Sequence, residues 1–110
     1  MTTARDAEAG AAPPGGFART DDGARWVASG ALTFANAGPV LAQARALPLP
    51  ASGVVDVSGI GAVDSAAVAV LLAVKRLGGS EGRDLVFAGA PGSLASLAAL
   101  YGVEEMLGRG

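Results

Sequence analysis

Two short acid and hydroxyl pairs carry most of the polar chemistry in this sequence. Asp56 and Ser58 stand at the end of a β-branched run, and Asp64 and Ser65 stand at the start of a long apolar segment. A hydroxyl in the first turn of a helix lies where the helix dipole and the free backbone amides favour a phosphate or another anion. Ser65 is therefore a candidate phosphoacceptor or contact residue. Asp64 or Ser65 also suits an ordinary N-cap, which contributes about 1 kcal/mol.

The other residue types argue against catalysis. The chain contains no histidine and no cysteine, which excludes a Ser-His-Asp triad and the commonest metal ligands. Gly59-Ile60-Gly61 resembles a dinucleotide-binding turn, but Asp64 stands where the third glycine is required and would repel a pyrophosphate. Asp56 and Asp64 flank this segment without further polar groups to complete a catalytic set, and Asp56 is expected to accept loop amides. We expect no enzyme activity and no cofactor; a small anion or nucleotide site over 58–65 is the alternative.

Length and composition indicate one small domain with an apolar surface. The chain has 110 residues, of which 51% are hydrophobic and 16% charged, and its net charge is -2. So much apolar side chain in so small a domain suggests that some of it faces a partner. There is no dense basic cluster, so we expect no binding to nucleic acid. Charges near the start argue against a signal peptide, and no apolar run is long enough for direct membrane insertion. We expect a cytoplasmic protein.

The pattern of apolar residues and chain breakers predicts an α/β domain in the order β-β-α-β-α-β-α. A flexible tail is expected over residues 1–16, followed by a single domain over 17–110. Strands are predicted at 17–20, 26–30, 54–57 and 84–88, and helices at 36–46, 65–77 and 91–101, with a last turn over 103–107. Asn36 is a candidate cap of the first helix. The right-handed crossover rule makes the strands at 54–57 and 84–88 parallel neighbours.

The helix predicted at 65–77 is apolar all round. Residues 66–74 contain no polar side chain, whereas a helix lying on one side of a small sheet needs a single apolar stripe. Either a neighbouring helix covers the other face, or Ala67, Val70 and Val74 form a small-residue strip on which another protein docks. The sequence leaves both alternatives open.

These motifs together resemble a known family. Val55-Asp56-Val57-Ser58-Gly59, followed by Val63-Asp64-Ser65 and an apolar helix, resembles the signature of STAS domains. The resemblance extends from about Trp26 to Leu107. It implies a STAS-like small mixed sheet of about four strands, with helices packed mainly on one side.

Within this family, the segments 30–34 and 100–107 look most like MlaB-type proteins. That resemblance implies a non-enzymatic accessory subunit, which binds and supports the ATPase subunit of a phospholipid-transport ABC system. Such a subunit would reach the inner face of the membrane through its partner complex. By that resemblance Ser65 and Tyr101 are candidate contacts with the ATPase. With the start of the apolar helix included, the partner-binding residues that we expect are Asp64, Ser65, Ala66, Ala67, Val70 and Tyr101.

Anti-sigma factor antagonists are the alternative class in the same family. They are phosphorylated by an anti-sigma factor kinase on the hydroxyl that follows the Asp, which is the position of Ser65. In those proteins a small or polar residue and then Gly-Leu usually follow, whereas Ala66-Ala67-Val68 follow here. This departure weakens the phosphorylation hypothesis, because a docking kinase is expected to reach Ser65 past Ala67.

Overall fold

Four strands form one mixed sheet in the computed structural model, which describes residues 15–107. The strands lie in the order β1 (Gly16–Arg19), β2 (Arg25–Leu32), β3 (Val54–Val63) and β4 (Val86–Ala88). β1 is antiparallel to β2, and the β2–β3 and β3–β4 pairs are parallel. The α/β class, the order of elements and the predicted parallel pair are confirmed. The tail predicted at 1–16 lies outside the described residues except for Gly15 and Gly16, and Gly16 already belongs to β1.

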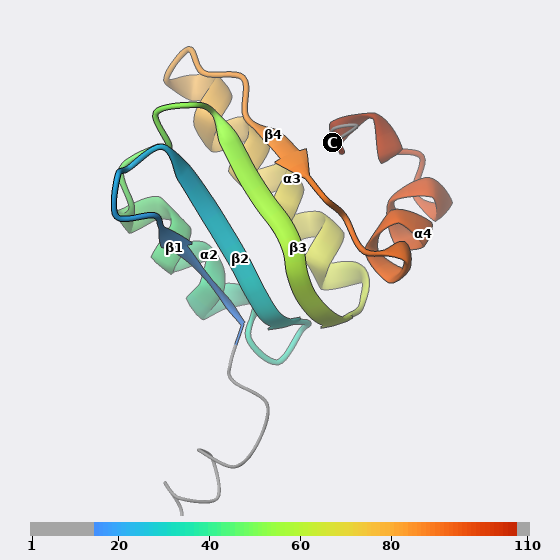
Figure 1. The fold of residues 1–110 in the computed structure, drawn as a ribbon. Helices are drawn as coiled ribbons and strands as arrows, with labels where there is room; N and C mark the ends of the chain where they lie inside the picture. The colour runs from blue at the N-terminus through green and yellow to red at the C-terminus, as the bar shows by residue number, and fades with distance from the viewer. Residues whose placement is uncertain (1–14, 108–110) are drawn as a thin grey trace, which may run out of the picture.

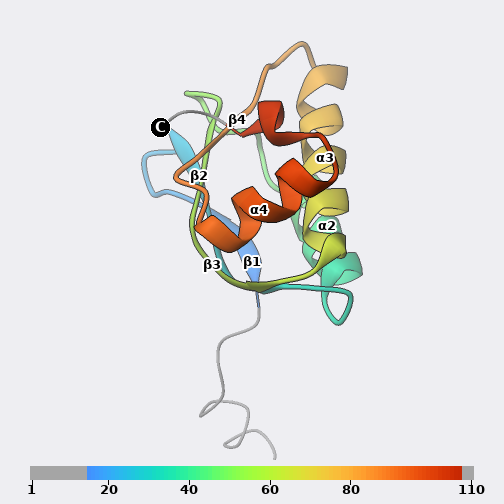
Figure 2. The same ribbon diagram turned by 90° about the vertical axis from the view of Figure 1, so that its right-hand side faces the viewer.

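The helices are α2 (Ala37–Ala46), α3 (Ser65–Ser80) and α4 (Gly92–Leu100), followed by the short 3-10 helix η1 (Glu104–Met106). Figures 1 and 2 show α2 and α3 side by side on one face of the sheet, while α4 lies beside α3 and β3. The helices of the described chain leave the opposite face of the sheet uncovered (Figure 1). This is the predicted arrangement of helices mainly on one side.

The core lies between the sheet and the helices because alternate strand residues point to the same face. Trp26, Val55 and Phe87 from the sheet and Leu71 from α3 are fully buried. The indole Nε1 of Trp26 donates a hydrogen bond to the Pro48 carbonyl at 2.8 Å, which satisfies the one polar atom of this side chain.

The strand predicted at 54–57 continues to Val63, where a loop was expected. Its second half still pairs with β2, and the register shifts between Val27 and Ser29 and again between Gly30 and Leu32. At Gly59 an added Cβ would lie 3.1 Å from the Ala28 carbonyl oxygen, so a glycine permits the close approach of the two strands. The segment expected to form a loop therefore runs as a strand directly to Asp64.

The helix predicted to end at residue 77 continues to Ser80. Gly78 lies inside α3 and packs against Leu85, where an added Cβ would come within 2.6 Å of the Leu85 Cγ atom. The chain turns at Gly82, whose φ of 73° is favourable only for glycine. Gly78 thus serves packing, and the glycine that belongs to the turn stands four residues later.

Candidate functional site

Asp64 joins the start of α3 to the turn before α2. Its Oδ1 atom accepts the Ala66 backbone amide at 2.8 Å, which is an N-cap bond, and its Oδ2 atom accepts the Phe34 backbone amide at 3.1 Å. The capping role predicted for this position is confirmed for Asp64. Ser65 is the first helical residue and is half-buried, and its hydroxyl makes no hydrogen bond to any of the residues 15–107. The Ser65 hydroxyl is thus free to bond to another molecule.

The turn that carries Phe34 is held by Asn36. The Asn36 Oδ1 atom accepts the Thr33 amide at 3.0 Å, and its Nδ2 atom donates to the Ala31 carbonyl at 2.8 Å. Asn36 is the N-cap residue of α2, as predicted, but its side chain makes no cap bond, because it bonds to Thr33 and Ala31 instead. The Phe34 ring is 75% exposed. The turn that exposes Phe34 is therefore hydrogen-bonded to the start of α3.

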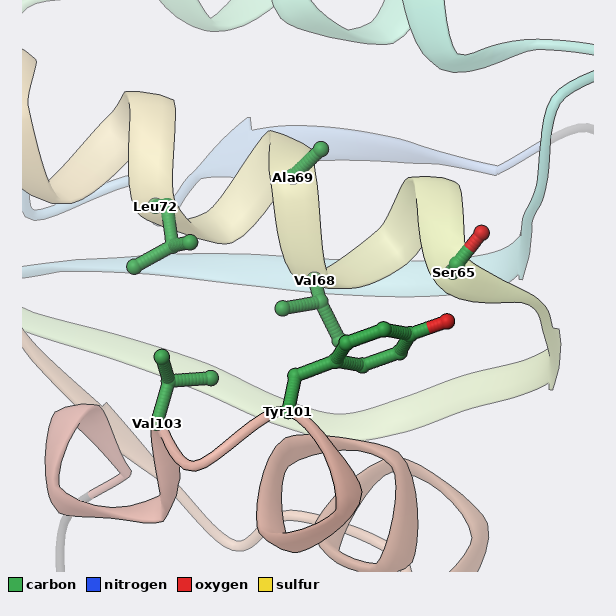
Figure 3. Close-up of a pocket in the computed structure, with 6 residues that line it drawn as sticks. All are labelled: Ser65, Val68, Ala69, Leu72, Tyr101 and Val103. Atoms are coloured by element: carbon green, nitrogen blue, oxygen red, sulfur yellow. The ribbon is translucent and has the colours of Figure 1, made fainter.

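An apolar groove separates α3 from the end of α4. Its first hollow has a volume of about 250 Å³ and is lined by Ser65, Val68, Ala69, Leu72, Tyr101 and Val103. Figure 3 shows the Tyr101 ring across the hollow, with its hydroxyl directed toward the Ser65 end. Two hydroxyls therefore mark one end of an otherwise apolar surface. We refer to this hollow and its extension, described next, as the α3–α4 groove.

The groove continues into a second hollow of about 390 Å³. Leu72 and Val103 line both hollows, and the second one adds Lys75, Gly102, Glu105 and Met106. The apolar surface therefore passes from hydroxyls at one end to charged side chains at the other.

The structure brings together only some of the residues predicted to bind a partner. Ser65 and Tyr101 line the same hollow, and Asp64 lies directly beside it. Ala66, Ala67 and Val70 are buried within the domain, with 5%, 0% and 3% of their surface exposed.

The burial of these residues decides between the two alternatives for the apolar helix. Ala67, Val70 and Val74 belong to the core cluster of the chain itself. The first alternative holds: α2 packs beside α3, and these three side chains are core residues and not an exposed strip. Because Ala67 is fully buried, it also does not stand between a docking protein and Ser65.

Several groove residues were missed in the sequence. Val68, Ala69, Leu72 and Val103 line the groove, and the backbone amide of Phe34 is bonded to Asp64 at the start of α3. A signal was present, because residues 65, 69 and 72 recur at helical spacing and so lie on one face. The opposite wall lies about 30 residues further along the chain, and no local pattern pairs it with α3.

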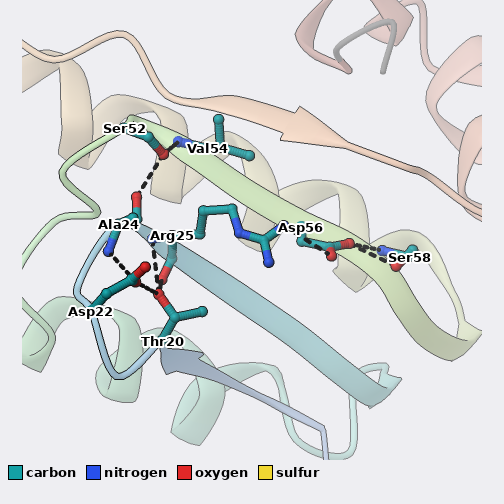
Figure 4. Close-up of polar contacts among 8 residues, drawn as sticks. All are labelled: Thr20, Asp22, Ala24, Arg25, Ser52, Val54, Asp56 and Ser58. Carbon is teal, nitrogen blue, oxygen red and sulfur yellow. Dashed lines mark hydrogen bonds and ion pairs between the residues drawn. The ribbon is translucent and has the colours of Figure 1, made fainter.

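The second acid and hydroxyl pair lies elsewhere, on the uncovered face of the sheet. The Asp56 Oδ1 atom accepts the Ser58 hydroxyl at 2.7 Å and the Ser58 amide at 2.9 Å (Figure 4). The Arg25 guanidinium lies 3.8 Å from Asp56 Oδ2. Two hydrogen bonds from Ser58 lower the pKa of Asp56: the bond from the hydroxyl has the larger effect, and the bond from the backbone amide comes second. Asp56 thus accepts an amide as expected, although that amide belongs to β3.

Asp56 and Asp64 do not form an acid pair. Seven residues of β3 separate them, roughly 25 Å at the rise of a β-strand. The hairpin turn holds a further carboxylate, Asp22, whose Oδ1 atom accepts the Thr20 hydroxyl at 2.7 Å and the Ala24 amide at 2.9 Å (Figure 4). The Ala24 amide is the main reason why the pKa of Asp22 is lowered. These bonds order the turn between β1 and β2.

No group of three or more His, Cys, Asp or Glu side chains in the described part of the chain, residues 15–107, is placed to hold a metal ion. No helix in the same part is both long and apolar enough to cross a membrane.

Comparison with known proteins agrees with this architecture. The model of the family described as "Mlab, STAS domain" matches residues 16–108, which include nearly every residue that the structure describes. No curated protein gives a significant match. The matched span begins at the first residue of β1 and includes the whole sheet, Asp64 and both walls of the α3–α4 groove. The chain therefore belongs to the MlaB-type family of STAS domains.

Proposed function

We propose that this domain is a non-enzymatic accessory subunit, which binds and supports the ATPase subunit of a phospholipid-transport ABC system. The observation that carries the proposal is the α3–α4 groove, an exposed apolar surface with the unbonded Ser65 hydroxyl at one end. Membership of the MlaB-type family supports this partner class. Binding to such an ATPase would place the protein in the cytoplasm, at the inner face of the membrane.

The distribution of exposed apolar side chains supports a contact at this end of the domain. Four large apolar side chains are exposed among the described residues, namely Phe34, Val86, Leu100 and Tyr101. Phe34 lies in the turn bonded to Asp64, and Leu100 and Tyr101 lie at the end of α4. Aromatic side chains are frequent energetic centres of protein interfaces. Three of the four exposed side chains thus belong to the two segments that flank the start of α3.

Replacement of Ser65 by Arg tests the proposal. The Ser65→Arg side chain would project over the first hollow and block close docking, so co-purification with the ATPase subunit of the same cells should be lost. Ser80→Arg is the matched control, because Ser80 is exposed on the same helix about 22 Å away by helical rise. Both variants should keep the wild-type circular dichroism spectrum and melting temperature. Normal ATPase binding by a folded Ser65→Arg variant would refute the proposed contact.

A phosphorylation switch is the second candidate function. Ser65 is partly exposed at the N-terminal, positive end of α3, and its hydroxyl makes no hydrogen bond among residues 15–107. Because Ala67 is buried, it does not obstruct a kinase that approaches Ser65. Under this alternative, intact-mass measurement of the protein from its native cells should show one phosphate on Ser65 that phosphatase removes. Absence of that phosphate in every growth condition, together with capture of an ABC ATPase, would favour the transporter subunit.

A further inference from the structure

The α3–α4 groove is long enough to hold a helix of another protein. Its two hollows are adjacent, because Leu72 and Val103 line both of them. Along α3 the depression extends from Ser65 to Lys75, ten residues or about 15 Å by helical rise. This length corresponds to nearly three turns of a helix laid in the groove.

The shape of the walls favours a helix over an extended strand. On the α3 side, Ser65, Ala69 and Leu72 form one row in which the first two side chains are small, so another helix axis can approach closely. The other wall is the end of α4 and the turn leading into η1, and no strand of the described chain borders the groove. Strand addition needs a free sheet edge, whereas an amphipathic helix needs an apolar groove.

The charges at the far end of the groove are unbalanced. Lys75 is already engaged, since its Nζ atom lies 3.0 Å from Asp84 Oδ1 and donates to the Leu85 carbonyl at 2.7 Å. Glu105 lines the second hollow, Glu104 is its exposed neighbour, and neither forms an ion pair within residues 15–107. The groove therefore combines an apolar floor with a carboxylate at its η1 end, Glu105, that has no ion-pair partner among residues 15–107.

From this combination we infer that the groove takes an amphipathic helix of the partner ATPase, with a Lys or Arg placed opposite Glu105. The inference rests on the proposed function and adds the chemistry and orientation of the contact. The apolar side chains of the partner helix, spaced three and four residues apart, enter the hollows beside Tyr101 and Leu72. The basic residue of the partner helix lies at the end of the groove opposite Ser65, which fixes the orientation of that helix along the groove.

Charge reversal tests this orientation. Binding of the purified ATPase subunit is measured by calorimetry at two salt concentrations for the wild type, Glu105→Lys, Glu105→Gln and Ser65→Arg. Glu81→Lys is the matched control, because Glu81 is an exposed acidic residue at the far end of α3 and does not line the groove. Glu105→Lys should weaken binding by about fivefold at low salt and Glu105→Gln by less, with a smaller loss at high salt. Glu81→Lys should bind like the wild type.

The outcomes separate the inference from the proposed function. If the wild type binds, Ser65→Arg does not and Glu105→Lys binds normally, the ATPase contact holds and the basic helix is refuted. If the ATPase subunit does not bind the wild type, both are refuted. A photo-crosslinker at Leu72 supplies a second readout: the crosslinked ATPase peptide should belong to a helix that contains Lys or Arg, and a peptide from a strand or an acidic segment would overturn the inference.

Discussion

The Asp64 carboxylate accepts the backbone amide of Phe34 at 3.1 Å, across 30 residues of sequence. The other oxygen of the same carboxylate caps α3 by accepting the Ala66 amide. One side chain therefore fixes both the first turn of the helix and the turn that exposes the Phe34 ring. Helix capping and the position of the turn that exposes Phe34 depend on the same residue.

Removal of this carboxylate should lower stability and loosen the Phe34 turn. We expect Asp64→Ala to reduce the free energy of unfolding by about 1 to 2 kcal/mol, because the cap and the bond to the Phe34 amide are both lost. Asp64→Asn should cost less, since its single amide oxygen still caps the helix. Urea unfolding measures the stability, and hydrogen exchange of the Phe34 amide reports on the second bond. Unchanged exchange of that amide in Asp64→Ala would contradict the link between the two segments.

Phe34 should matter for binding and not for folding. Its ring is 75% exposed, so Phe34→Ala should leave the melting temperature unchanged while it weakens ATPase binding by about 1 kcal/mol or more, the usual effect of an aromatic contact residue. Val86→Ala provides the control, because Val86 is an exposed apolar residue on β4, away from the start of α3. Equal affinities of Phe34→Ala and wild type would place the ring outside the interface.

Two adjacent glycines of α3 should respond in opposite ways to the same substitution. Gly78→Ala should lower the free energy of unfolding by about 1 to 3 kcal/mol, because the added Cβ meets Leu85 Cγ at 2.6 Å and the Arg83 carbonyl oxygen at 3.1 Å. The Cβ that Gly79→Ala adds would have no atom within 4 Å. This variant should raise the free energy of unfolding by about 0.5 to 1 kcal/mol, because alanine has a higher helix propensity than glycine. Thermal and urea unfolding of the pair measure both effects. A stabilised Gly78→Ala variant would show that Leu85 does not pack against this turn of α3.

The sequence predicts the framework of this fold because its elements have clear local signals. Pro48 and Pro50 follow the first helix, the β-branched run at 54–57 indicates a central strand, and helical spacing marks the remaining helices. The local signals are weaker where tertiary contacts determine the secondary structure. Glycines 59 and 61 indicate a loop, yet pairing with β2 keeps them in a strand.

The candidate site is less predictable, since its parts meet only in three dimensions. Asp64 and Ser65 are recognisable from the local motif, and Tyr101 from the family resemblance. The apolar face of α3 is ambiguous, because composition does not tell which side the sheet covers; Ala67 and Val70 proved to be core residues and Ala69 and Leu72 groove residues. Phe34 is placed by a bond to a residue 30 positions away, which no periodicity indicates.

The acid dependence of stability should contain a contribution from Asp56 that Ser58 controls. The Ser58 hydroxyl and amide hold the pKa of Asp56 below its ordinary value, so folding favours the ionised carboxylate. This stabilisation is present above the pKa of the unfolded state and is lost as the pH falls through the lower pKa of the folded state. Ser58→Ala removes the hydroxyl bond, which is the largest cause, and should raise the pKa of Asp56 toward its ordinary value. The stability difference between wild type and Ser58→Ala should therefore be largest near neutral pH and shrink under acid conditions.

A carboxyl NMR titration measures the pKa of Asp56, and urea unfolding at neutral and acid pH measures the stability difference. Ser29→Ala is the control, because Ser29 is an exposed serine of β2. An Asp56 titration that is the same in Ser58→Ala and wild type would show that the hydroxyl does not set this pKa.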